Sequence, residues 1–314
     1  MPRKIALLFS GQGAQQVGMG RDLANHYAVA ANLFAQTDRL LNRPLSQLAF
    51  DGPTEELTRT RNCQLALYVH GLAVLRVLEE EAGPLPAVAA AGLSLGEFTA
   101  HAAGETFDFG AGLHLVAERS RFMDVACNET MGTMAAFVGG EESLIRLVAA
   151  EADVDVANLN APGQIVLSGE IFKIEKAIAI ARQRGVRRAV PLTVAGAFHS
   201  RLMNSAKQKL QSELAMVDVR VPRFMVIANV TALPVHDAAE IRSTLSDQVV
   251  GSVRWAESIE YLIDQAGCDL FLELGPGSVL AGLVKRIRKG VEVLSIEDLP
   301  SLEQALPIIR AAIG

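Results

Sequence analysis

The chain has 314 residues, of which 50% are hydrophobic and 20% charged, and its formal net charge is -6 with an isoelectric point near 5.6. This length suits one large domain, or one domain with a smaller insert, and a core of that size needs no disulfide or metal. The acidic balance argues against nucleic acid as a main partner, because phosphate binding needs a basic face.

Cysteine use and hydropathy point to the compartment. Cys63, Cys127 and Cys268 are far apart and odd in number, and they show no metal-ligand spacing, which favours a reduced cytosol. The apolar run in "MPRKIALLFSGQG" is too short for a signal peptide. No run approaches the roughly 18 apolar residues of a membrane span. We therefore expect a soluble, cytoplasmic protein without metal or membrane contacts.

The predicted elements begin with a buried strand over 4–10, which ends in glycine-rich sequence, and a helix over 64–80. A second strand over 87–94 enters a glycine turn, and a helix follows it. Near the C-terminus, 268–287 predicts a strand, a glycine turn and a helix, and 291–296 a further strand. Strands that alternate with helices indicate a parallel sheet covered on both faces.

The middle of the chain has a different element order, β-α-β-β-α-β, which is that of a ferredoxin-like unit. Its predicted elements are a strand (133–139), a helix (141–152), two strands (154–160 and 163–169), a helix (171–185) and a strand (187–194). We therefore predict a small ferredoxin-like subdomain at 129–197. It is inserted in a large α/β-hydrolase-like domain with a parallel sheet, made of residues 1–128 and 198–314.

The stretch "GLSLG" (92–96) places Ser94 between two glycines, after a strand and before a helix. Such a turn forms a nucleophile elbow, in which the glycines permit a strained backbone and the helix amides point towards the serine. The alternative is a serine in an ordinary tight turn. The pattern alone leaves both interpretations open.

A nucleophilic serine needs a base, and the sequence has six histidines. His199 stands at the junction where the predicted insert returns to the large domain, and clefts form at such junctions. It is therefore the best candidate by position. Of the others, His26 is predicted to lie on the surface, and His70 and His114 are predicted to be packed within apolar helices. His101 is assigned to local structure after the elbow, and His236 to a loop.

Two glycine-rich segments, 11–16 and 275–280, lack the third glycine of a dinucleotide-binding fingerprint. We interpret them as turns at the carboxyl edge of the sheet, where the backbone amide of Gln12 could face a ligand. Arg119 lies on the helix predicted after the elbow helix, where a solvated position is the simplest interpretation. Arg119 and Arg121 cannot face the same way, because residues two apart on a helix diverge.

Taken together, these motifs resemble the malonyl-CoA:acyl carrier protein transacylases and the acyltransferase domains of fatty acid and polyketide synthases. The resemblance covers essentially the whole chain. The matching stretches, in order, are "FSGQGAQQVGMG", "CQLALY", "GLSLGEFTA", "ERSRFM", "NAPGQIVLSG", "GAFHSRLM", "QVVGSVRWAESI" and "ELGPGSVL".

The resemblance implies a ping-pong transfer of malonyl from coenzyme A to the phosphopantetheine thiol of an acyl carrier protein. Ser94 would be acylated, and His199 would take its proton and later activate the incoming thiol. The backbone amides of Gln12 and Leu95 would form the oxyanion hole. Arg119 would pair with the free malonyl carboxylate, for which a bidentate guanidinium is well shaped.

Four further positions follow from the resemblance. Gln64 and Asn160 would line the site, and the backbone carbonyl of Gln248 would orient the histidine, so that no third carboxylate is required. Phe198 is typical of malonyl-selective members, because its ring fills the space that an α-methyl group would need. Leu93 stands where the family usually has histidine.

Partners and alternatives complete these expectations. We expect malonyl-CoA as donor, an acidic acyl carrier protein as acceptor, no bound cofactor or metal, and a monomer. An acyl hydrolase or thioesterase on the same scaffold is the alternative activity, and a non-catalytic binding protein is a third. Arg201, where proline is common, is expected on the surface. Candidate docking cations, or simply solvated helix ends, are Arg182, Arg184, Arg187, Arg188, Lys285, Arg286, Arg288 and Lys289.

Overall fold

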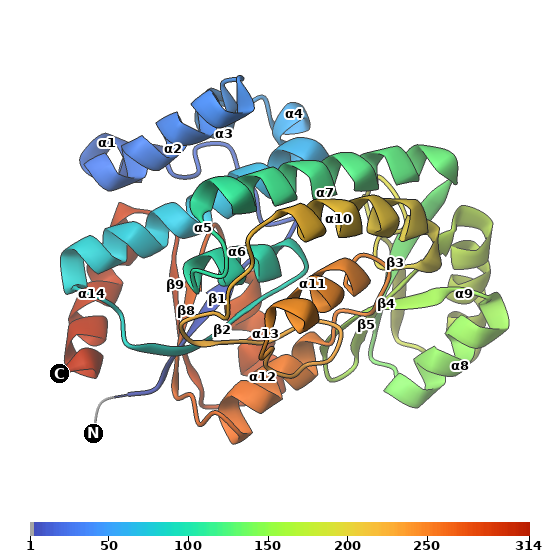
Figure 1. Cartoon of the computed structure of the whole chain (residues 1–314). Helices are drawn as coiled ribbons and strands as arrows, with labels where there is room; N and C mark the ends of the chain where they lie inside the picture. Colours follow the sequence, from blue (N-terminus) through green and yellow to red (C-terminus); the bar gives the residue numbers. More distant parts are fainter. Residues whose placement is uncertain (1–2) are drawn as a thin grey trace.

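The computed structural model describes residues 3–314, and every strand and helix predicted above is present in it with bounds shifted by a few residues. The segment between the first strand and the long helix α5 (Thr60–Ala82), for which no element bounds were predicted, forms four helices (Figure 1). Up to the middle of the chain the elements are β1 (Ile5–Phe9), α1 (Arg21–His26), α2 (Ala28–Leu41), α3 (Leu45–Asp51), α4 (Thr54–Thr58), α5 (Thr60–Ala82), β2 (Ala87–Gly92), α6 (Leu95–Ala103) and α7 (Phe109–Glu129).

The remaining elements form the small sheet and then complete the large one. They are β3 (Gly132–Val138), α8 (Glu142–Ala152), β4 (Asp155–Ala161), β5 (Gln164–Glu170), α9 (Ile171–Gln183), β6 (Arg188–Pro191), α10 (Asn204–Met216), β7 (Met225–Val226), α11 (Ala238–Asp247), α12 (Trp255–Asp264), β8 (Leu270–Leu274), α13 (Val279–Ile287), β9 (Glu292–Ile296) and α14 (Leu299–Ile313).

The large sheet has five parallel strands in the order β7-β2-β1-β8-β9. Alternate residues of a strand point to opposite faces, and both faces here are apolar. Ile5, Leu7 and Phe9 of β1 join the core beneath α5 and α6, whereas Ala6 and Leu8 join a second core with α12 and α13. The sheet is therefore the middle layer of three (Figure 1).

The small sheet is antiparallel, in the order β4-β5-β3-β6, and α8 and α9 cover one of its faces. On the other face, Met134 and Val166 belong to the main core of the large part. An isolated bridge between Asn158 and Val253 also ties this sheet to the segment before α12. The small sheet thus lies directly against the large part and can contribute side chains to a cleft between them.

One expectation about packing is wrong. His114, predicted inside an apolar helix face, is exposed on α7, and its Nε2 atom lies 2.9 Å from Glu213 Oε2. The apolar residues around it in sequence lie on other sides of the helix. Between residues 3 and 314, no helix is both long enough and apolar enough to cross a membrane.

Candidate active site

Ser94 occupies a strained turn at the carboxyl end of β2, directly before α6. Its backbone has φ 55° and ψ -106°, in a region that residues other than glycine rarely adopt. The two flanking glycines permit a very close approach. A Cβ atom on Gly92 would lie 1.8 Å from the carbonyl carbon of Gly96, and one on Gly96 would lie 2.1 Å from the Phe9 oxygen. No larger residue fits at either position without backbone movement.

Two distant side chains hold the Ser94 backbone in this conformation. Asn229 accepts a hydrogen bond from Ser94 N at 2.8 Å and donates to the Gly92 carbonyl at 2.8 Å. Gln248 donates from Nε2 to the Ser94 carbonyl, also at 2.8 Å. A strained residue persists only where its surroundings over-determine it, and these bonds do so on both sides of the serine.

His199 lies in the loop that follows β6, is 4% exposed, and also has a positive φ of 55°. Its Nε2 atom lies 2.8 Å from Ser94 Oγ, and its Nδ1 atom 2.8 Å from the carbonyl oxygen of Gln248. Because a carbonyl only accepts, Nδ1 carries the proton and Nε2 is left to accept one from Ser94. Burial, with a further contribution from the Arg119 charge, lowers the pKa of His199 to about 4.

Arg119 is fully buried on α7, which excludes the solvated position, whereas Arg121 on the opposite side of the helix is exposed. The Nη2 atom of Arg119 donates to Ser94 Oγ at 3.0 Å and to Gln248 Oε1 at 2.8 Å. Its Nη1 atom donates to Gln64 Oε1 at 2.6 Å. Burial lowers the pKa of Arg119 to about 10, so the guanidinium remains charged at neutral pH.

A cavity of about 190 Å³ opens in front of Ser94 and His199, between the large part and the small sheet. Gln64, Asn160 and Phe198, which the family resemblance placed at the site, all line it. Leu93 also faces it and contributes only apolar surface. The other lining residues are Gln12, Met123, Met134, Asn158, Val166, Leu192 and Val194.

Of the two positions assigned to an oxyanion hole, Gln12 lines this cavity and Leu95 directly follows Ser94. Leu95 is the first residue of α6, so its amide has no acceptor within the helix. Gln12 follows the end of β1, and its side-chain Oε1 atom lies 3.4 Å from Gln64 Nε2. Gln12 therefore lies in the turn after β1 and Leu95 at the start of α6, both at the carboxyl edge of the sheet.

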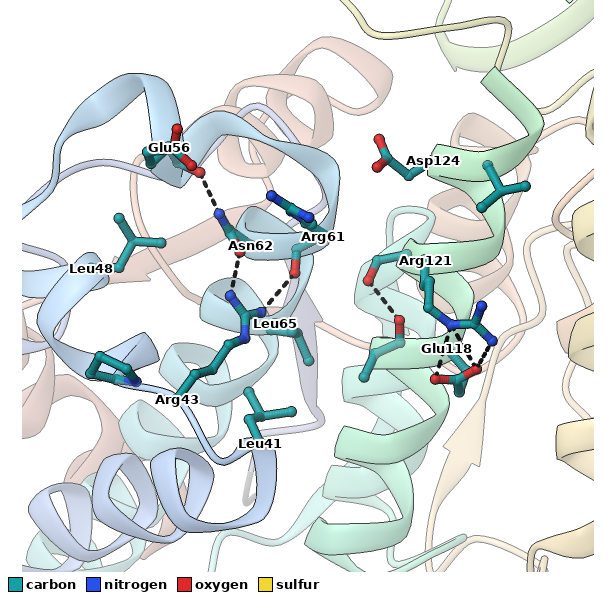
Figure 2. A pocket seen from close by; sticks show the side chains of 14 residues that line it. Leu41, Arg43, Leu48, Glu56, Arg61, Asn62, Leu65, Glu118, Arg121 and Asp124 are labelled. Atoms are coloured by element: carbon teal, nitrogen blue, oxygen red, sulfur yellow. Dashed lines mark hydrogen bonds and ion pairs between the residues drawn. The ribbon is translucent and has the colours of Figure 1, made fainter. Parts of the chain in front are cut away.

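A larger cavity, about 940 Å³, does not contain Ser94 or His199 (Figure 2). It lies between the loop after α2 and the exposed side of α7, and charges of both signs line it, among them Arg43, Arg61 and Asp124. We place the site in the smaller cavity because Ser94 and His199 line it and the buried Arg119 contacts Ser94 Oγ from behind its wall. Among residues 3–314, no cluster of three His, Cys, Asp or Glu side chains is placed to hold a metal ion.

Sequence analysis missed two residues beneath the nucleophile, Asn229 and Glu97. Asn229 follows β7, a two-residue strand paired with β2, and a polar residue after a short apolar run was the available signal. Glu97 lies three residues after Ser94 and is fully buried, with Oε2 accepting from Gln248 Nε2 at 2.6 Å and from Asn229 N at 3.1 Å. Its signal was a single acid in the apolar stretch "LGEFTAHAA".

Arg201 lies on the surface, and it is not among the residues that line the cavity. Its guanidinium pairs with Asp153 and Asp155, each at 2.8 Å. It therefore ties the turn after His199 to the edge of the small sheet. Burial plays little part here, so we assign this pair a small contribution to stability.

A Ser-His pair beside a buried arginine, at the edge of a parallel sheet, can form and release an acyl-serine. The chain matches the model of the acyl transferase domain over residues 6–305, and it therefore belongs to that family. Among its relatives is the malonyl CoA-acyl carrier protein transacylase of Bacillus subtilis, 39% identical over 312 residues, which are 98% of each chain.

Solved structures agree with this family. The acyl-carrier-protein S-malonyltransferase of Bartonella henselae is 36% identical with a TM-score of 0.93, covering 98% of this chain and 99% of that one. A malonyl-transacylase in complex with a type II polyketide synthase acyl-carrier protein is 35% identical with a TM-score of 0.93, covering 97% and 99%. The resemblance seen in the sequence is confirmed.

Proposed function

We propose that this enzyme transfers a malonyl group from malonyl-CoA to the phosphopantetheine thiol of an acyl carrier protein, for fatty acid or polyketide synthesis. The observation that carries the proposal is the position of Ser94 Oγ, 2.8 Å from His199 Nε2 and 3.0 Å from Arg119 Nη2. A nucleophile, a base and a carboxylate-binding cation therefore meet at one atom. The names of the relatives support the same donor and acceptor.

In the first half-reaction, Ser94 Oγ attacks the thioester carbonyl while His199 Nε2 takes its proton. The C–S bond breaks, and His199 gives the proton to the departing coenzyme A sulfur. In the second, His199 takes a proton from the carrier thiol, whose sulfur attacks the malonyl-serine. Ser94 Oγ then leaves and recovers the proton. The lowered pKa of His199 keeps the imidazole neutral and able to accept a proton near neutral pH.

The surrounding groups have assigned roles in this scheme. The backbone amides of Gln12 and Leu95 would stabilise the tetrahedral oxyanion. Arg119 would bind the malonyl carboxylate after releasing one of its present acceptors, and the Gln248 carbonyl would orient His199. Phe198 would disfavour an α-methyl substituent, an effect worth about 1–3 kcal/mol. We propose that the chemistry needs no bound metal or cofactor.

The test is acylation of Ser94. Wild-type enzyme mixed with malonyl-CoA should gain one malonyl group in intact-mass spectrometry, and Ser94→Ala should gain none. Labelling of Ser94→Ala would remove the serine from the mechanism. Adding carrier protein should move the group to the carrier, whereas release of free malonate would favour the hydrolase alternative, to which a carboxylate-binding arginine offers no advantage.

We also propose docking of an acidic carrier protein on the cations of the small part and α13. Arg184 and Arg288 already pair with Glu151 and Asp264, and Arg286 bonds to Gln164. Because Arg286 and Gln164 touch, the two groups of cations lie on adjoining elements. Among residues 3–314, the exposed cations of these two groups without a side-chain partner are Arg182, Arg187, Arg188, Lys285 and Lys289.

We also propose a more specific classification for the two parts of the fold. The strand order β4-β5-β3-β6, with both helices on one face, supports a ferredoxin-like subdomain at 129–197. The elbow at the end of β2 supports an α/β-hydrolase-like domain from 1–128 and 198–314. We propose that the enzyme acts as a cytoplasmic monomer.

A further inference from the structure

A buried hydrogen-bond network beneath the site is centred on the side-chain amide of Gln248. Its Oε1 atom accepts from Arg119, and its Nε2 atom donates to the Ser94 carbonyl and to Glu97 Oε2. Arg119 can only donate, and a carboxylate can only accept. A flipped amide would set donors against Arg119 and an acceptor against Glu97. Glu97 therefore helps to fix which end of Gln248 faces Arg119.

Glu97 is itself held rigidly. It lies in the first turn of α6, where a negative charge is favourable, and it accepts a second hydrogen bond from Asn229 N at 3.1 Å. Its other oxygen, Oε1, is buried and has no hydrogen-bond partner within residues 3–314. That oxygen can hold a proton without breaking either existing bond.

The charges around Glu97 are few. Arg119 on α7 is the nearby cation, and its direct polar partners, Gln64, Gln248 and Ser94, are all neutral. The other titratable groups are Cys63 on α5, beside Arg119, His199 in its loop, and His101 one turn further along α6. Burial holds all three neutral near pH 7, raising the pKa of Cys63 to about 12 and lowering those of His199 and His101 to about 4 and 3.

Resting on the proposed function, we propose that Glu97 is a positioning residue that acts through Gln248 as the counter-charge of Arg119, and that it takes up one proton when a malonyl carboxylate binds there. Two carboxylates cannot both remain ionised around one guanidinium in a closed site without mutual repulsion. The malonyl group must stay ionised to pair with Arg119, so the proton goes from solvent to Glu97 Oε1. Burial already raises the pKa of Glu97 to about 7, so uptake is possible near neutral pH.

This coupling makes malonyl transfer depend on pH in a way that acetyl transfer does not. As pH rises above the Glu97 pKa, binding of malonyl-CoA must be accompanied by uptake of a proton from solvent onto the ionised Glu97 carboxylate, whereas acetyl-CoA carries no acyl charge and needs no such uptake. The ratio of kcat/KM for malonyl-CoA to that for acetyl-CoA should therefore fall by up to about tenfold per pH unit. The phosphates of coenzyme A are common to both donors and cancel in the ratio.

The variant Glu97→Gln keeps an acceptor for Gln248 and Asn229 but removes the titration. For this variant, the ratio of kcat/KM for malonyl-CoA to that for acetyl-CoA, measured from about pH 6 to pH 9, should be independent of pH. A matched control is Glu273→Gln, because Glu273 is also fully buried but accepts from Leu280 N and Ala281 N at the start of α13. In that control, the ratio should fall with rising pH as steeply as it does in the wild-type enzyme. A flat wild-type ratio, or an unchanged slope in Glu97→Gln, would overturn the proposal.

A second measurement keeps the test open if Glu97→Gln does not fold. Ser94→Ala binds donors without turnover, and calorimetry in buffers of different ionisation enthalpy counts the protons taken up on binding. At about pH 7.5, malonyl-CoA should take up more protons than acetyl-CoA, and equal uptake would refute the role of Glu97. Failure of the proposed function would be seen separately, as the absence of malonyl-serine in the wild-type enzyme.

Discussion

At the scale of single residues, Arg119 is a buried cation that touches the nucleophile and has only neutral direct partners. A buried charge is costly unless it is paired, so we expect a donor with its own carboxylate to bind favourably beside Arg119. Because Ser94 Oγ already lies in reach of Arg119, an acyl group on that oxygen starts beside the guanidinium. This geometry favours donors with a second, ionised carboxyl group.

Replacing Arg119 with alanine should therefore affect the two donors differently. Loss of a buried ion pair costs about 3–5 kcal/mol, so kcat/KM for malonyl-CoA should fall by about 100-fold or more. Acetyl transfer should fall much less, because it uses no carboxylate. Steady-state assays measure the loss of kcat/KM for each of the two donors. Arg121→Ala, on the exposed side of α7, is the control. Equal losses for both donors would make Arg119 a structural residue only.

At the scale of elements, the elbow depends on three segments that nearly touch: the end of β1, the end of β2 and the start of α6. Gly92 and Gly96 are the points of closest approach, and Asn229 and Gln248 clamp the serine between them. The position of the hydroxyl is therefore set by backbone contacts. A small change in their spacing moves Ser94 away from His199.

Gly96→Ala tests this spacing. Its Cβ atom would lie 2.1 Å from the Phe9 carbonyl, so β1 and α6 must separate. We expect a loss of at least about 2 kcal/mol in the free energy of unfolding, together with a severe loss of acylation. Denaturant titration and the malonyl-serine assay measure both. Gly282→Ala is the matched control, because nothing lies within 4 Å of its added methyl group in α13, and helix propensity predicts slightly higher stability.

At the scale of the whole molecule, three histidines are buried in the large part: His70 on α5, His101 on α6 and His199 in the loop after β6. Burial lowers the pKa of His70 to about 4, of His101 to about 3 and of His199 to about 4. In the unfolded chain these groups titrate near 6.5, so below that pH the unfolded state binds more protons than the folded state. Their contribution to stability is therefore complete above about pH 6.5 and is lost as pH falls towards 4.

The free energy of unfolding should accordingly fall between about pH 7 and pH 5. Burial also raises the pKa values of Glu97 and Glu273, and these two carboxyls act in the opposite direction as pH falls, two groups against three. His101→Gln should make the free energy of unfolding depend less steeply on pH, because it removes one of the three titrating groups. Each proton contributes at most about 1.4 kcal/mol per pH unit. Denaturant titrations of the wild type and of His101→Gln at several pH values measure this dependence. An unaltered slope in His101→Gln would contradict this account.

The sequence determined what local pattern and motif order can determine. Alternating apolar runs and glycine turns predicted the strands and helices, and the Gly-x-Ser-x-Gly turn located Ser94, because such features depend on residues close together in the chain. The tertiary structure decided the surroundings of these residues. It buried Arg119, exposed His114, and brought Asn229, Glu97 and Gln248 together beneath the serine. The amide of Gln248 meets a carbonyl 154 residues away. The burial of a side chain, and the pKa that burial sets, depend on which distant segments pack together. Local sequence patterns do not determine that packing.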